Sequence, residues 1–153
     1  MKPLFIALFL VLFVSCSDDE NCLEKDYRDA NETEITEFIN LNDLDAMRSD
    51  SGLHYVIDEP GTGAQPTASS NVTVAYKGTY TNGTVFDQSD ENGISFDLNR
   101  VIPGWTEGIQ YFKEGGSGLL LVPSHLAYGS CDYNGIPGGS VLVFEVNLIS
   151  VNQ

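Results

Sequence analysis

Between residues 53 and 151 the hydrophobic positions repeat mainly with a period of two, which is the pattern of half-buried β-strands. Residues 72–80 alternate apolar and polar side chains, and residues 141–150 place Leu142, Phe144, Val146 and Leu148 on one face. The dipeptide Asn82-Gly83 is typical of a β-hairpin, because both residues tolerate positive φ. Shorter strand candidates are residues 53–57, 84–87, 94–98 and 117–122.

The one helical repeat inside this region follows Pro103-Gly104, with Trp105, Ile109 and Phe112 at positions i, i+4 and i+7. Gly115-Gly116 ends it. Five or six strands with one central helix, joined mostly by local connections, predict an antiparallel sheet and an α+β fold.

A second helical pattern precedes the strands. Between Asn31 and Met47 the apolar residues recur at spacings of three and four, which predicts a short amphipathic helix or two with Thr33 as a candidate N-cap. Ser51-Gly52 ends this lead-in. The apolar positions are Ile35, Phe38, Ile39, Leu41, Leu44 and Met47.

Residues 1–15 combine Lys2 with an apolar run from Leu4 to Val14, the pattern of a secretory signal peptide and too short to span a bilayer. The run ends at Ser15-Cys16 and resembles a bacterial lipobox, which implies cleavage before Cys16 and acylation of that residue. Ordinary secretory cleavage with Cys16 as a thiol is the alternative. We therefore expect a signal peptide at 1–15, a lipidated acidic tether at 16–31, a helical lead-in at 32–51 and one domain at 52–153.

The charge balance limits the classes of partner that the protein can bind. The chain has 153 residues, 42% of them hydrophobic, and carries 22 acids against 7 bases for a net charge of -15. Such a chain can build a core, but it repels phosphate backbones, so we expect no nucleic-acid partner. The acidic tract at residues 17–20 resembles surface-export tags of Bacteroidetes lipoproteins, or it is a solvated spacer.

Conventional catalytic groups are missing from the sequence. The only histidines are His54 and His125, no G-x-S-x-G is present, and no C-x-x-C or His/Cys cluster predicts a metal. Cys22 and Cys131 could pair in an oxidising compartment or remain thiols. What stands out is a set of aromatic residues beside turns, which could be core or pocket: Tyr76, Phe86, Phe96, Trp105, Tyr128 and Phe144.

Four motifs resemble the FKBP-type peptidyl-prolyl cis-trans isomerases, in the family's order and at similar distances. They are VTVAYKGTYTNGTVFD at 72–87, VIPGW at 101–105, HLAYG at 125–129 and GIPGGSVLVFEV at 135–146. The resemblance runs from about Gly52 to Val151. It implies an antiparallel sheet half-wrapped around a short central helix, with a pocket between sheet and helix and no cofactor.

The resemblance also implies roles for individual residues. Asp87 matches the polar residue at the pocket edge, while the backbone N–H of Ile102 and the hydroxyl of Tyr128 match the donors to ligand carbonyls. Trp105 would be the floor under a proline ring, and Ile136 would lie in the flap. The substrate-binding set is Tyr76, Phe86, Phe96, Val101, Trp105, Ile136 and Phe144.

The loop after Tyr128 departs from the small cytosolic members of the family. It is about one residue shorter, it holds Cys131, Asp132 and Tyr133, and Gly138-Gly139 replaces a Pro-rich pair. These changes bear on substrate preference and inhibitor affinity.

The resemblance implies an isomerase that assists the folding of exported proteins. Its partners would be proline-containing peptides, unfolded exported proteins and macrolide inhibitors, and it would be a monomer held at the bacterial cell envelope by a lipid anchor. The alternatives are a non-catalytic proline-peptide-binding or chaperone module and an adhesion scaffold.

Overall fold

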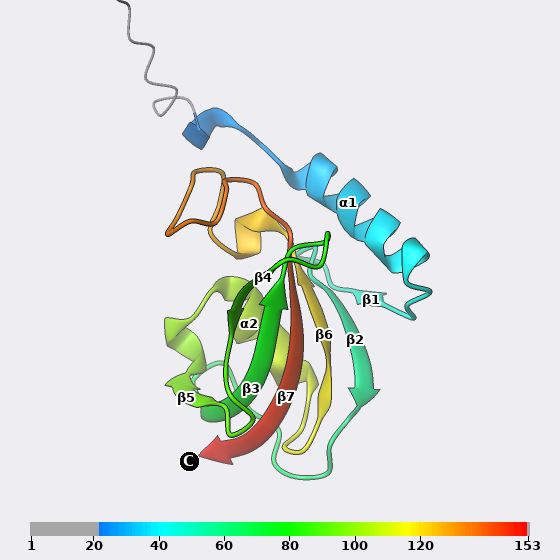
Figure 1. Ribbon diagram of the computed structural model, residues 1–153. Helices are drawn as coiled ribbons and strands as arrows, with labels where there is room; N and C mark the ends of the chain where they lie inside the picture. Colours follow the sequence, from blue (N-terminus) through cyan, green and yellow to red (C-terminus); the bar gives the residue numbers. More distant parts are fainter. Residues whose placement is uncertain (1–21, 153) are drawn as a thin grey trace, which may run out of the picture.

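The computed structural model describes residues 22–152, and an antiparallel sheet curled around a short helix dominates it (Figure 1). The strand order is β1-β2-β6-β7-β3-β4, and β5 also pairs with β3. The helices are α1 (Arg28–Leu41) and α2 (Pro103–Gly108). The strands are β1 (Met47–Arg48), β2 (His54–Glu59), β3 (Asn71–Thr79), β4 (Val85–Gln88), β5 (Ile94–Asp97), β6 (Ser117–Val122) and β7 (Leu142–Asn152).

The predicted strands and central helix are confirmed within a residue or two at most ends. The helical stretch is split, because α2 ends at Gly108 and a 3-10 turn, Ile109–Tyr111, completes it. Its three apolar residues Trp105, Ile109 and Phe112 are all buried. The hairpin at Asn82-Gly83 is also present, but only Gly83 adopts a positive φ, of 85°. The loop therefore matches a three-residue hairpin rather than a two-residue one.

The main core lies between α2 and the inner face of the sheet. The four predicted inward residues of β7 are all buried there, together with Val72, Val74 and Leu120. Burial of each such side chain contributes about 1.5–3 kcal/mol, so this cluster fixes the position of α2 against the strands.

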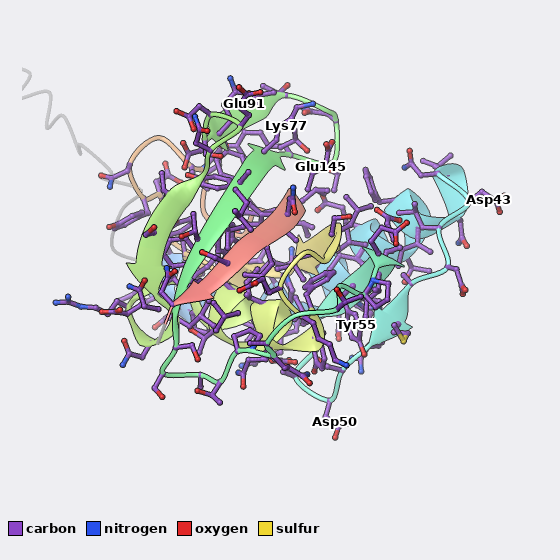
Figure 2. All side chains as sticks on the ribbon, turned by 90° about the horizontal axis from the view of Figure 1, so that it is seen from below. Asp43, Asp50, Tyr55, Lys77, Glu91 and Glu145 are labelled. Atoms are coloured by element: carbon purple, nitrogen blue, oxygen red, sulfur yellow. A yellow bond between two sulfur atoms is a disulfide. The ribbon has the colours of Figure 1, made fainter. Side chains whose placement is uncertain are left out.

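The outer face of the sheet carries charged residues on β3 and β7. Lys77 and Glu145 are direct cross-strand neighbours on β3 and β7, with 3.8 Å between Nζ and Oε1, and both are exposed. Figure 2 shows them close to Glu91, on the side of the sheet away from α2. Exposed pairs of this kind add little stability.

Helix α1 corrects several expectations about the lead-in. It begins at Arg28, so Thr33 is not an N-cap but lies inside the helix, where its hydroxyl donates to the Asp29 carbonyl at 2.9 Å. Met47 lies in β1, not in a helix. The expected tether to residue 31 also overlaps the folded region, because Asn31 is buried.

A second, smaller core explains where α1 docks. Ile35 of α1 packs with Leu121, Val141 and Val143 on the opposite face of the sheet from α2. The beginning of β7 is therefore buried on both faces. Leu41, predicted as part of the apolar stripe, is instead 86% exposed at the end of the helix.

A disulfide joins Cys22 to Cys131, which settles the pairing that the sequence left open. Their Cα atoms are 5.1 Å apart, although 109 positions separate them in the chain. Cys16 and the predicted signal peptide lie outside the described residues. Within residues 22–152, no helix has the length and apolar character needed to cross a membrane.

Candidate active site

The floor of the candidate site is the indole of Trp105, which α2 presents toward the sheet. Its ring centroid is 5.1 Å from that of Tyr76, 5.4 Å from Phe96 and 5.2 Å from Phe144. The contacts to Tyr76 and Phe144 are edge-to-face, the arrangement that aromatic quadrupoles favour. The indole is 5% exposed and cannot turn without displacing these rings.

The Phe86 ring forms the cavity wall on β4, and its position depends on a glycine in β3. A Cβ added to Gly78 would lie 2.6 Å from Cζ of Phe86 and 3.1 Å from Cε1 of Phe144. Gly78 is therefore the residue that lets the Phe86 ring lie over the strand and meet Phe144 edge-to-face, with 5.6 Å between the ring centroids.

These rings line a cavity of about 590 Å³ that is open to solvent on one side. Every site residue predicted from the sequence contributes to its lining except Ile136. Ile136 lies in an adjoining groove of about 450 Å³, beside Tyr80 and Val85. The lining residues are Tyr76, Phe86, Asp87, Ile94, Phe96, Arg100, Val101, Ile102, Trp105, Tyr128, Tyr133, Asn134 and Phe144.

One polar pair crosses the pocket wall. The Tyr76 hydroxyl donates a hydrogen bond to Oδ2 of Asp87 at 2.6 Å. Burial, reinforced by this hydrogen bond to Asp87, raises the pKa of Tyr76 well above its usual value. Tyr76 therefore stays protonated at neutral pH and holds the Asp87 carboxylate in a fixed orientation.

Two tyrosines of the loop after β6 form a rim of the cavity. The rings of Tyr128 and Tyr133 stack with 4.9 Å between centroids and 10° between planes. Burial, and then the neighbouring Tyr133, raises the pKa of Tyr128, so its hydroxyl is a donor at neutral pH. It is still 37% exposed and accessible to a ligand.

A second donor lies at the start of α2. Ile102 is the N-cap residue, and backbone N–H groups at a helix start have no acceptor within the helix. Tyr128 and Ile102, which carry these two donors, both line the same cavity.

Of the cavity residues that the sequence did not predict, Tyr133 and Asn134 belong to the loop after Tyr128. Tyr133 and Ile136 exchange two backbone hydrogen bonds of 2.9 Å across a tight turn. Asn134 and Gly135 adopt positive φ values of 46° and 84°, as a type I′ turn requires. The dipeptide Asn134-Gly135 is the same signal that predicted the hairpin at 82–83, so this turn could have been found.

Ile94 and Arg100 also line the cavity, but no comparable sequence pattern predicts their place there. Ile94 begins β5 and is exposed, and Arg100 ends a 3-10 turn, Leu98–Arg100. They reach the cavity only because β5 pairs with β3 and returns the chain to α2. No group of three His, Cys, Asp or Glu residues in the described part of the chain could hold a metal ion.

A half-wrapped antiparallel sheet with an aromatic cavity against its central helix is the architecture of the FKBP class. The model of the family described as FKBP-type peptidyl-prolyl cis-trans isomerase matches residues 63–149, more than half of the chain. The chain therefore belongs to this family, as the four motifs predicted.

Comparisons with individual relatives support the same family assignment. The chain is 46% identical over 107 residues to the FKBP-type peptidyl-prolyl cis-trans isomerase FkpA of Aeromonas hydrophila, an alignment covering 69% of this chain and 40% of that one. The crystal structure of FkpA from Escherichia coli matches with a TM-score of 0.74 and 40% identity, over 85% of this chain and 62% of that one. An isomerase structure from Pseudomonas syringae matches with a TM-score of 0.72 and 33% identity, over 84% and 98%. The chain thus spans less than half the length of the first of these.

Proposed function

We propose that the chain is a peptidyl-prolyl cis-trans isomerase, which rotates X-Pro amide bonds in the cavity above Trp105. The observation that carries the proposal is an aromatic floor in contact with three rings, in a cavity that is also lined by Tyr128 and Ile102, two residues with hydrogen-bond donors. A proline ring fits against such a floor, and the carbonyl groups that flank it can accept from the donors.

The reaction requires no bond cleavage, so it requires no nucleophile. Partial double-bond character gives the amide a rotation barrier of about 18–20 kcal/mol. The twisted transition state loses this resonance and has less charge separation than the planar amide. An apolar cavity therefore disfavours the planar form relative to the twisted one, and burial of the proline ring supplies the binding energy.

The polar residues would orient the substrate. A hydrogen bond from the Tyr128 hydroxyl or the Ile102 N–H would hold a substrate carbonyl in the twisted arrangement. Asp87, fixed by Tyr76, would face the amide from the wall on β4. Phe86, Phe96, Val101 and Phe144 would exclude water from the ring, while Ile136 would contact a residue that flanks the proline.

We further propose that the protein works outside the cytoplasm on unfolded exported proteins, as a monomer held to the cell envelope by lipid on Cys16. The Cys22–Cys131 disulfide supports an oxidising compartment. Metabolic labelling with a fatty acid should mark the protein, and a Cys16→Ala form should lose the label. A Cys16→Ala form that still labels would contradict the anchor.

The test of the activity is an isomerase assay on short peptides that vary the residue before proline. We expect catalysis that a pocket-filling macrolide such as rapamycin blocks. A folded protein whose Trp105 fluorescence responds to a proline peptide, but which leaves the isomerisation rate unchanged, would instead be a binding module.

A further inference from the structure

The loop that carries the tyrosine rim is attached to residues far away in the sequence. Between β6 and β7 the chain runs from Ser124 to Gly139 and bears Tyr128, Tyr133 and Ile136; we call this segment the lid loop. Figure 1 shows it in orange beside the segment that leads into α1. The segment that leads into α1 and the first turns of that helix contact the lid loop at both of its ends and near its middle.

Asn31 connects the two ends. Its Nδ2 donates to the Gly139 carbonyl at 2.8 Å, and its Oδ1 accepts the Ser124 N–H at 2.8 Å. The side chain is 1% exposed, so water cannot replace either bond. Asn31 is thus a buried polar residue whose side chain closes the base of the lid loop.

These bonds continue to the backbone beside Tyr128. The Gly139 N–H donates to the Gly129 carbonyl at 2.9 Å, and the Gly129 N–H donates to the Ser124 carbonyl at 2.8 Å. Gly129 is therefore tied to the two residues that Asn31 holds. A shift of Asn31 would move the peptide unit next to the Tyr128 ring.

The middle of the lid loop is held covalently. Cys131 is bonded to Cys22. In the chain it falls between Tyr128 and Tyr133, whose rings stack on each other. The Tyr27 ring also covers Gly139, where an added Cβ would lie 2.5 Å from its Cδ1. The segment from residue 22 to residue 31 therefore contacts the lid loop through a disulfide, a ring and a side-chain amide.

We propose that Asn31 and the Cys22–Cys131 disulfide are positioning residues for the isomerase site, which hold the lid loop so that Tyr128 and Tyr133 face the cavity. The inference rests on the proposed function. Without these attachments, a loop with glycines at 129, 135, 138 and 139 has more conformations open to it. Ordering it upon substrate binding then costs affinity.

The expected signature is a change in KM without a comparable change in kcat. In Asn31→Ala, and in the double variant Cys22→Ser with Cys131→Ser, we expect KM for a proline peptide to rise about tenfold, which corresponds to about 1.4 kcal/mol. We expect kcat to stay within about twofold, because the floor is unchanged. Amide hydrogen exchange should accelerate in residues 128–139 and stay slow in β3 and β7.

The full chain, purified in a mild detergent, serves for these measurements. Asn40→Ala is the matched control, since Asn40 is an exposed residue of the same helix and should leave KM unchanged. If Asn31→Ala fails to fold, wild-type protein treated with a thiol reductant provides the second measurement, provided that its circular dichroism is unchanged.

The outcomes separate this inference from the proposed function. Since the chain has one tryptophan, Trp105 fluorescence reports peptide binding whether or not catalysis occurs. If the wild type binds but does not catalyse, the proposed activity fails, and a tenfold rise in Kd on loss of Asn31 or the disulfide still supports positioning. Folded variants with wild-type KM and Kd would overturn the inference. A wild type that neither binds nor catalyses would overturn both.

Discussion

The floor and the rim of the cavity are held in place by different parts of the chain. Trp105 is fixed by Tyr76, Phe96 and Phe144, all inside residues 63–149, which the family model matches. Tyr128 lies on the lid loop, which is held by Asn31 and Cys22 from outside that segment. Ring packing in the core is therefore sufficient for the floor, whereas the rim depends on residues that precede the matched domain.

The largest effect should come from the floor. We expect Trp105→Leu to reduce kcat/KM on the order of a hundredfold, because the loss of about 3 kcal/mol of ring contacts removes the platform for proline. Steady-state isomerase kinetics measure it. Phe112→Leu is the matched control, since Phe112 is fully buried in the same core but does not line the cavity. Equal losses in both variants would mean that the effect is only one of stability.

A smaller effect should come from the rim. Tyr128→Phe removes one hydroxyl and keeps the ring stacked on Tyr133, so kcat/KM should fall about tenfold, the contribution of about one hydrogen bond. The thermal midpoint should not change. Tyr133→Phe, whose hydroxyl we assign no role, provides the comparison. A Tyr128→Phe enzyme as active as the wild type would remove this hydroxyl from the site.

Asp87 tests the wall between the two regions. We expect Asp87→Ala to lower turnover several-fold without unfolding the domain, because the carboxylate is exposed and accepts its hydrogen bond from the Tyr76 hydroxyl. Tyr76→Phe should reproduce part of the loss, since it releases the carboxylate but keeps its charge. Unchanged kcat/KM for both variants, measured on the same peptide, would contradict the assignment.

The smallest effect concerns how α1 is attached. His54 of β2 is buried, with Nε2 3.6 Å from Oε1 of Glu32 in α1. Burial lowers the pKa of His54 despite Glu32, so the unfolded chain binds more protons in mildly acidic solution. Stability should therefore be full above the unfolded pKa of about 6.5 and decline as the pH falls below it.

Chemical denaturation at pH 7.5 and 5.5 checks this prediction. The loss of stability on acidification should be smaller in His54→Gln than in the wild type. His125→Gln is a suitable control because His125 is exposed. An identical pH dependence in His54→Gln and the wild type would show that His54 does not contribute.

These two regions also differ in how far the sequence could predict them. The floor was predictable because strand periodicity and four motifs placed Trp105, Phe144 and Tyr76 together. The role of Asn31 was not predictable. In the sequence, an Asn within an acidic stretch cannot be told from a solvated one, and its hydrogen-bond partners lie 93 and 108 positions away. Arg100 and Ile94 reach the cavity through loop geometry that no local pattern encodes, whereas the Asn134-Gly135 turn did carry a readable signal.

The most direct test of the central claim is exchange spectroscopy by NMR on a proline peptide at equilibrium, with the protein at substoichiometric concentration. Uncatalysed interconversion takes tens to hundreds of seconds. We expect cis–trans exchange peaks on a sub-second to second timescale, which are lost in Trp105→Leu and kept in Phe112→Leu. Peptide resonances that shift on binding while the exchange rate stays at its uncatalysed value would contradict it.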